Sequence, residues 1–261
     1  MLFRSLADRL RTPKQAKAAV RWYDRSLELL EALPGTARAS REAVRCRLDA
    51  QAGRGRALLV DGRPEEAVAY CRKLLSSASG KDRAIIGSLL GEGCARMGVK
   101  SYQAAKIDEA ERHLAEAIRH LTAAGDEKSA DPHNKQYLII VRILHARCLA
   151  QLGQHARAAA ELAKSRSVVN EPTQLATIAC SYALAAEAAR NDTALPQAQR
   201  DQLAESYAVE AMLILKKVVQ MGNTPAVDLR TFLRDDKDLA CLRARKDFKE
   251  LVASVEKGEK R

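Results

Sequence analysis

One spacing of small residues occurs twice in the chain and restricts its fold more than any other feature. A small residue is followed seven positions later by glycine and twelve positions later by alanine, in Gly55, Gly62, Ala67 and again in Ala146, Gly153, Ala158. The middle glycine interrupts a helical pattern, where it can end one helix in the left-handed conformation. The small residues on either side let two helices approach closely. The spacing therefore predicts antiparallel helix pairs.

Proline and glycine divide the rest of the sequence in the same way, because proline is tolerated at the first helical position and glycine follows helix ends. We predict helices over residues 14–32, 37–60, 64–78, 82–104, 106–123, 134–151, 154–168, 172–189, 197–220 and 244–257, with a short one near 226–233. No strand pattern competes with them. The abundance of Ala, Leu, Arg and Glu, with only ten aromatic residues among 261, also favours an all-α chain.

The repeated spacing resembles the tetratricopeptide repeat (TPR). A third copy is expected from Gly91 through Gly98 to Ala110, with 12 positions instead of 5 between the glycine and the alanine. The excess, residues 99–105, is close to two helical turns, so either longer helices or a short loop could hold it. The resemblance implies a right-handed superhelical stack of antiparallel TPR-like helix pairs, an alpha-alpha superhelix.

We expect three segments along this stack. Residues 1–36 form a basic helical segment that packs on the repeats, residues 37–170 form TPR-like helix pairs, and residues 171–261 form a C-terminal helix pair and closing segment of the same solenoid. Within the first segment, an apolar face is expected from Trp22, Tyr23, Leu27, Leu30 and Leu33. A shorter amphipathic helix is expected before it, with Leu2, Phe3, Leu6 and Leu10 on one face.

The last 90 residues contain a more specific pattern. Its parts are Ala179-Cys180-Ser-Tyr182, Leu203-Ala-Glu-Ser-Tyr207-Ala-Val-Glu-Ala211, Asp236-Lys-Asp238-Leu239-Ala-Cys-Leu242-Arg243 and Asp247-Phe248-Lys-Glu-Leu251. This pattern is similar to the TPR tail of planctomycete-type bacterial serine/threonine protein kinases. Cys241 and Lys246 stand where such tails usually have proline, which we expect to loosen the closing turn.

The kinase motifs are missing from this chain. Gly53-Arg-Gly55 lacks the third glycine of a phosphate loop, and Arg234-Asp235-Asp236 has no asparagine downstream at the spacing of a catalytic loop. The resemblance therefore implies a tail or a stand-alone relative that serves assembly, with no enzyme activity in this polypeptide.

Other chemistry receives little support from the sequence. His113, Glu116 and His120 share a helical face but are expected to be a solvated stripe, and His145 with Cys148 gives a poor nucleophile pair. We expect no catalytic residues, metal or cofactor. The six cysteines are scattered without a CxxC motif, which fits free thiols in a reducing cytoplasm. No apolar run is long enough to span a membrane.

The inner helix of each pair lines the concave groove in which repeat proteins bind extended peptides. The groove-facing positions of the two clear copies are Asp49, Ala52, Arg56, Leu59 and Ile140, Ile143, Arg147, Ala150. Arg56 and Arg147 share one register, and the arginine fork suits a carboxylate or a phosphate. We expect Asp49, Arg56, Leu59, Ile140, Ile143 and Arg147 to contact a peptide or partner helix, with an acidic group as one option. The alternative, two merely solvated arginines, stays open.

These features favour a non-enzymatic protein-protein interaction module. One alternative is a split-off regulatory tail that works with a kinase on another polypeptide. A further alternative is a binder of nucleic acid or anionic surfaces, since residues 1–60 carry thirteen Lys/Arg against six Asp/Glu within a net charge of +11. Interleaved acids and a single aromatic pair, Trp22-Tyr23, count against nucleic acid.

Overall fold

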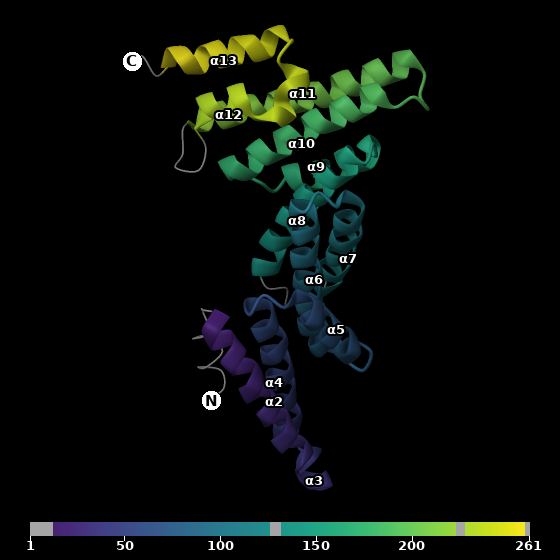
Figure 1. Cartoon of the computed structure of the whole chain (residues 1–261), viewed down its shortest axis with the longest axis vertical. Coiled ribbons are helices and arrows are strands. Elements are labelled where there is room, and N and C mark those ends of the chain that lie inside the picture. Colours follow the sequence, from purple (N-terminus) through teal and green to yellow (C-terminus); the bar gives the residue numbers. More distant parts are fainter. Residues whose placement is uncertain (1–12, 126–131, 223–227, 259–261) are drawn as a thin grey trace. The chain divides into compact units, whose positions relative to one another are not determined.

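The computed structural model describes residues 13–125, 132–222 and 228–258, and every regular element in these ranges is helical (Figure 1). The elements are α2 (Pro13–Glu31), α3 (Gly35–Arg38), α4 (Arg41–Val60), α5 (Pro64–Leu75), α6 (Gly80–Gln103), α7 (Ile107–Gly125), α8 (Pro132–Gln151), α9 (His155–Arg166), α10 (Pro172–Asn191), α11 (Gln197–Met221), α12 (Leu229–Asp235), the 3-10 helix η1 (Lys237–Leu242) and α13 (Lys246–Gly258). The predicted fold class is confirmed: the chain is an all-α protein of antiparallel, TPR-like helix pairs.

The predicted helices agree with the observed ones to within a few residues, apart from two differences. The helix expected over 37–60 is divided into α3 and α4, because the Ser40 hydroxyl accepts a hydrogen bond from the Ala43 amide at 3.2 Å and starts a new helix. The element η1 was not predicted. The amphipathic helix expected from Leu2, Phe3, Leu6 and Leu10 lies outside the described residues.

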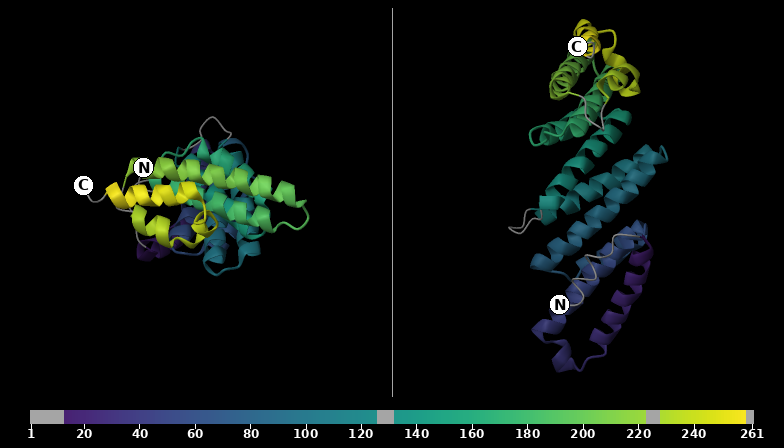
Figure 2. Two further views of the ribbon diagram at one scale, coloured as in Figure 1. Left: turned by 90° about the horizontal axis from the view of Figure 1, so that it is seen from above. Right: turned by 90° about the vertical axis from the view of Figure 1, so that its left-hand side faces the viewer.

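The chain separates into two compact units. Unit 1 comprises residues 1–100 and 113–138, and unit 2 comprises residues 101–112 and 139–261. In unit 1, α2 lies beside α4, and in unit 2 the long helices α10 and α11 lie side by side (Figures 1 and 2). The division into segments 1–36, 37–170 and 171–261 stays a prediction.

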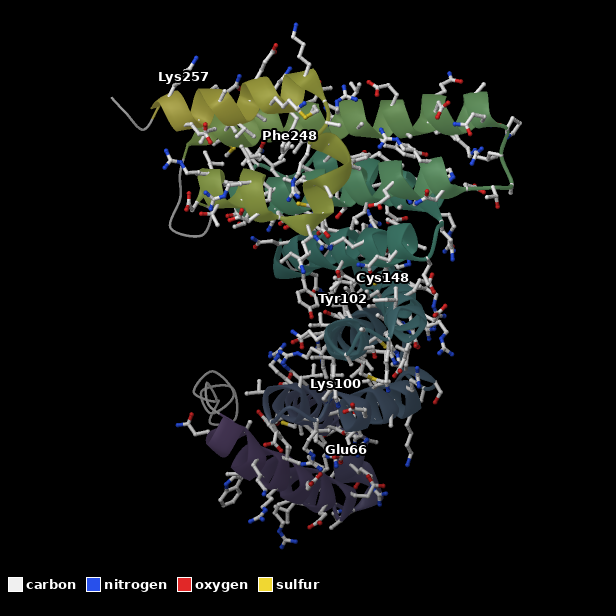
Figure 3. All side chains as sticks on the ribbon, turned by 45° about the horizontal axis from the view of Figure 1, so that its top comes forward. Glu66, Lys100, Tyr102, Cys148, Phe248 and Lys257 are labelled. Carbon is white, nitrogen blue, oxygen red and sulfur yellow. The ribbon has the colours of Figure 1, made fainter. Side chains whose placement is uncertain are left out.

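The core of unit 2 is a continuous apolar cluster. Alanines on α10 and α11, such as Ala183, Ala186 and Ala211, are fully buried, so the two helices pack closely. Leucines from the C-terminal elements complete the cluster, and Phe248 of α13 lies in it while Lys257 extends to solvent (Figure 3).

Three turns between paired helices close in the same way. The amides of Gly62 and Arg63 donate to Leu59 O and Leu58 O, and those of Gly153 and Gln154 donate to Ala150 O and Leu149 O. The amides of Ala105 and Lys106 repeat this pattern on Tyr102 O and Ser101 O. In each turn, the first of the two residues whose amides donate has positive φ, namely 77° at Gly62, 75° at Gly153 and 57° at Ala105.

The third copy of the repeat is therefore corrected. Ala105, not Gly98, occupies its turn, although left-handed backbone is unfavourable for alanine. Gly98 is the small residue seven positions earlier, and Ala110 follows the turn by five. Residues 99–103 belong to α6, so the expected seven-residue excess is an ordinary repeat counted from the wrong glycine.

The apolar face predicted for the first packed helix is only partly correct. Tyr23 is buried at 7% exposure, and its ring fills the space over Gly53 of α4. Asp24 accepts a hydrogen bond from Arg54 Nε at 2.5 Å beside this contact. Leu27, Leu30 and Leu33 are half-buried, but Trp22 is 63% exposed. Trp22 precedes the buried Tyr23 by one position, which turns its side chain away from α4.

Two glycines of α6 predict opposite effects of the same substitution. In Gly91→Ala, the new Cβ would lie 2.7 Å from Leu121 Cγ and 3.2 Å from Ala117 O of α7, so we expect a loss of about 1–3 kcal/mol in unfolding free energy. Gly87→Ala meets only His120 O at 4.0 Å and should gain about 0.5–1 kcal/mol from helix propensity. Urea unfolding of the two variants tests this, and equal shifts would contradict the close α6–α7 contact.

Candidate functional site

The inner helices α4 and α8 carry the two arginines predicted to bind a partner. Arg56 and Arg147 each lie six residues before the turn glycine of their pair. Both turns close with the same backbone hydrogen bonds. Arg56 and Arg147 therefore occupy equivalent positions in two equivalent helix pairs. The chemistry at one position therefore indicates what the other can do.

Arg147 already binds a carboxylate of its own chain. Its Nη2 donates to the Asp238 carboxylate of η1, and its Nε donates to the Tyr102 hydroxyl at 3.3 Å. The Arg147 side chain is 19% exposed. Burial alone would lower its pKa, but the Asp238 charge and the Tyr102 hydroxyl outweigh burial and raise the pKa above its ordinary value. Arg147 is therefore a permanent cation held by a half-buried anion.

Asp238 is placed by the way η1 begins. The Asp236 carboxylate caps the 3-10 helix by accepting a hydrogen bond from the Asp238 amide at 2.9 Å. Leu239 and Leu242 are fully buried against the core of unit 2. The Cys241 thiol donates to Ala183 O of α10 at 3.2 Å. Together these contacts fix the acidic start of η1 at Arg147.

The turn after η1 is well closed, despite Cys241 and Lys246 at positions where proline was expected. Arg245 binds Asp247 through Nε and Nη2 at 2.9 and 3.0 Å, and Glu205 of α11 through Nη1 at 2.6 Å. A bidentate ion pair thus holds the residues of this turn together.

Arg56 presents the opposite situation on α4. It is exposed, and neither it nor Asp49 has an ion-pair partner within the described ranges. Val99 of α6 occupies the equivalent register in the corrected third copy and is 38% exposed. Helices α4 and α6 are joined in unit 1 by Arg96 Nη1, which donates to Leu59 O at 3.2 Å. Unit 1 thus carries an exposed guanidinium on α4 and an exposed valine at the same register of α6.

The other predicted site residues divide by burial. Leu59 is 1% exposed and Ile143 is 4% exposed, so both belong to the core and not to an accessible groove. Leu59 packs towards Gly93 of α6, and Ile143 lies in the apolar core cluster of unit 2. Ile140 is 46% exposed and remains accessible on α8. Tyr102 was missed, but it falls at the register of Leu59 once Ala105 is taken as the turn residue.

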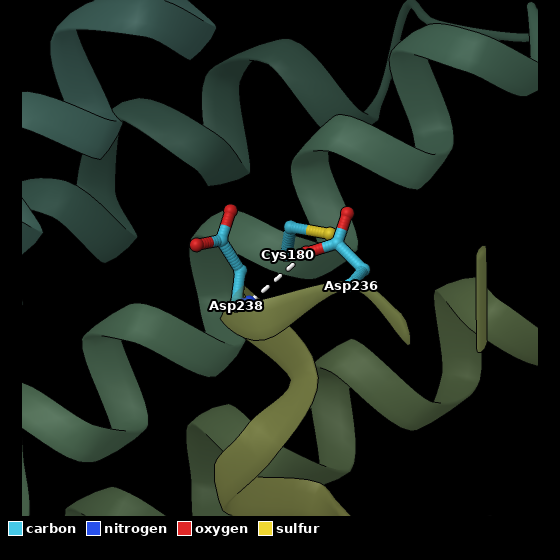
Figure 4. Close-up of side chains that lie close together, drawn as sticks. All are labelled: Cys180, Asp236 and Asp238. Carbon is cyan, nitrogen blue, oxygen red and sulfur yellow. Dashed lines mark hydrogen bonds between the residues drawn. The ribbon is translucent and has the colours of Figure 1, made fainter. Parts of the chain in front are cut away.

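A cluster that the sequence did not suggest joins Cys180 of α10 to Asp236 and Asp238 (Figure 4). One ligand atom from each lies within 4.8 Å of the others. Burial, followed by the two negative charges, strongly raises the pKa of the Cys180 thiol, so without a metal ion the thiol is protonated. Asp238 holds Arg147 and Asp236 caps η1, which gives both carboxylates structural roles.

The pairs weighed for catalysis or metal binding also have structural partners. Burial raises the pKa of Cys148 to about 11, the reverse of an activated nucleophile. His145 contacts Glu111 at 3.3 Å. Glu116 Oε2 accepts a hydrogen bond from Arg72 Nη2 at 2.8 Å, and Glu116 Oε1 lies 3.6 Å from His120 Nε2.

No helix among the described residues is both long and apolar enough to cross a bilayer.

A solved structure resembles this chain over most of its length. No protein-family model matches the sequence, and no curated protein matches it. Among solved structures, the chain is similar to the crystal structure of a putative kinesin light chain from Podosopora anserina with nearly identical TPR-like repeats. The two chains share 16% identity with a TM-score of 0.44, over 90% of this chain and 96% of the other.

Proposed function

We propose that this protein is a non-enzymatic interaction module that binds a peptide or partner helix on the inner face of α4 and α6, with Arg56 receiving an acidic group. The observation that carries the proposal is the contrast between the two equivalent arginines. Arg147 binds a carboxylate from the chain itself, whereas Arg56 is exposed and has no ion-pair partner in the described residues. The same position on a second repeat is thus available for an external carboxylate.

The groups around Arg56 suggest how a partner would be oriented. Asp49 lies two helical turns before Arg56 on the same face of α4. A partner segment with an acidic residue followed by a basic one would match both charges only when it runs antiparallel to α4. Its acidic residue would then face Arg56, and its basic residue would face Asp49. Val99, exposed at the same register of α6, would supply an apolar contact. The free cysteines of the described chain fit a cytoplasmic location.

The proposal is tested by a capture experiment with the full chain as bait, in nuclease-treated lysate washed at low and high salt. Proteins that survive high salt are purified, and their Kd is measured against wild-type, Arg56→Ala and Lys73→Ala chains. Lys73 is an exposed cation on α5, so its removal controls for net charge. We expect Arg56→Ala to weaken a genuine partner at least about tenfold, or about 1.4 kcal/mol, and Lys73→Ala to leave Kd unchanged.

The other outcomes separate the alternatives. An unchanged Kd for Arg56→Ala with every captured protein would overturn the role of Arg56. Capture of nucleic acid alone, with affinity falling steeply as salt rises, would replace the proposal with phosphate binding through the basic residues. A kinase among the captured proteins would support the regulatory-tail role suggested by the pattern in the last 90 residues.

A further inference from the structure

Helix α2 of unit 1 carries an apolar surface that nothing in the described chain covers. Trp22 is 63% exposed and Leu29 is 57% exposed, which makes them two of the three most exposed large hydrophobic residues described. They lie seven residues apart, so they share one side of the helix. Ala18, also exposed, extends the same side by one turn. We call these three residues the α2 stripe.

The α2 stripe is separate from the face that packs on α4. The buried residues of α2 are Ala16, Ala19, Val20 and Tyr23. At 100° per residue, the α2 stripe lies about 130° around the helix from the centre of that buried face. The body of unit 1 therefore uses one side of α2 and leaves an apolar side in water, which for a tryptophan and a leucine is typical of an interaction surface.

Charges along α2 show which partner fits the α2 stripe. Arg21 and Arg25 come before the midpoint between Trp22 and Leu29, and Glu28 comes after it. Arg25 binds Glu28 at 2.9 Å, whereas Arg21 is exposed and has no ion-pair partner in the described residues. On the side of α2 that carries the α2 stripe, these charges are basic before the midpoint and acidic after it, and such a surface is complementary to itself when the two copies run antiparallel. Asp24 also precedes the midpoint, but it is paired with a guanidinium of α4.

We propose that two copies of this chain associate through antiparallel contact of their α2 stripes. A two-fold axis between Arg25 and Ser26 places Trp22 of each copy against Leu29 of the other. It also brings Arg21 of each copy next to Glu28 of the other, where Glu28 joins Arg21 and Arg25 in one network. The surface is a single helix face, so the association is reversible and of the order of micromolar. This contact does not involve Arg56 and is independent of the proposed function.

The single tryptophan makes the contact directly observable. We expect sedimentation equilibrium of the full chain to show a mass that doubles with concentration. Over the same concentration range, Trp22 emission should shift to shorter wavelength as its ring leaves water. A mass that stays monomeric throughout would overturn the proposal. The proposal would also be overturned if the emission maximum of Trp22 were already at short wavelength at the lowest concentration and did not change. In that case a segment of the same chain would cover Trp22.

Two sets of variants test the geometry. Leu29→Lys should weaken association at least about tenfold, whereas Leu213→Lys, on a 48% exposed leucine of α11, should associate as the wild type does. Circular dichroism checks that both variants fold. Arg21→Glu should weaken association. Combining it with Arg25→Glu and Glu28→Arg should restore association, because the triple variant exchanges every charge of this network, including the Arg25–Glu28 pair. Dimers unaffected by Leu29→Lys, or no restoration in the triple variant, would exclude the antiparallel α2 contact.

Discussion

Leu242→Ala is expected to lower the unfolding free energy by about 2–5 kcal/mol, the range for a leucine whose removal leaves a cavity in a close-packed core. Leu242 is fully buried and lies in the same apolar cluster as α10 and α11. The measurement is urea unfolding followed by circular dichroism. Hydrogen exchange of α10 amides locates the loss, because two compact units need not unfold together.

The matched control is Leu213→Ala on α11, where the side chain is 48% exposed and the expected change is within about 0.5 kcal/mol. If the two variants behaved alike, η1 would be a detachable tail and Asp238 would be free to leave Arg147. A much larger loss of stability for Leu242→Ala than for Leu213→Ala would instead show that η1 is an integral part of the unit 2 core. Arg147 then stays closed to external acidic ligands, and Arg56 remains the available arginine.

Local signals were enough to predict most helices. Proline at 64 and 172 stands at the first position of α5 and α10, and Gly62 and Gly153 take the left-handed turn conformation. These signals act within a few residues, so the sequence displays them directly. The turn at Ala105 was misplaced because alanine seldom adopts positive φ, and the nearby Gly98 imitated the expected signal.

The candidate site was less predictable, since its partners are distant in sequence. Asp238 lies 91 residues after Arg147, and only the packing of η1 on α10 brings them together. Burial of Leu59 and Ile143 likewise depends on how closely neighbouring pairs approach, which register alone does not specify. Exposure of Trp22 was missed because an aromatic residue next to Tyr23 looks like core, although adjacent residues on a helix point in different directions.

Removal of the Asp238 carboxylate is expected to be nearly as disruptive as a core cavity. Asp238→Ala leaves the Arg147 guanidinium, 19% exposed in the folded chain, without its anion. We expect a loss of about 2–4 kcal/mol, somewhat below the range for fully buried pairs because water still reaches both groups. Urea unfolding by circular dichroism measures it. An exposed pair gives the control: Lys246 and Glu250 lie 3.9 Å apart on α13, and Glu250→Ala should leave stability unchanged.

The double variant Arg147→Met with Asp238→Leu separates the charge from the packing. It removes both ions and keeps apolar volume, so most of the stability lost in Asp238→Ala should return. If the double variant were as unstable as Asp238→Ala, the loss would come from the shape of η1 and not from an unpaired guanidinium. Recovery would instead show that this register binds a carboxylate because an uncompensated arginine is costly there. Arg56 escapes that cost through exposure to water, and an acidic partner that covered Arg56 would have to provide the anion.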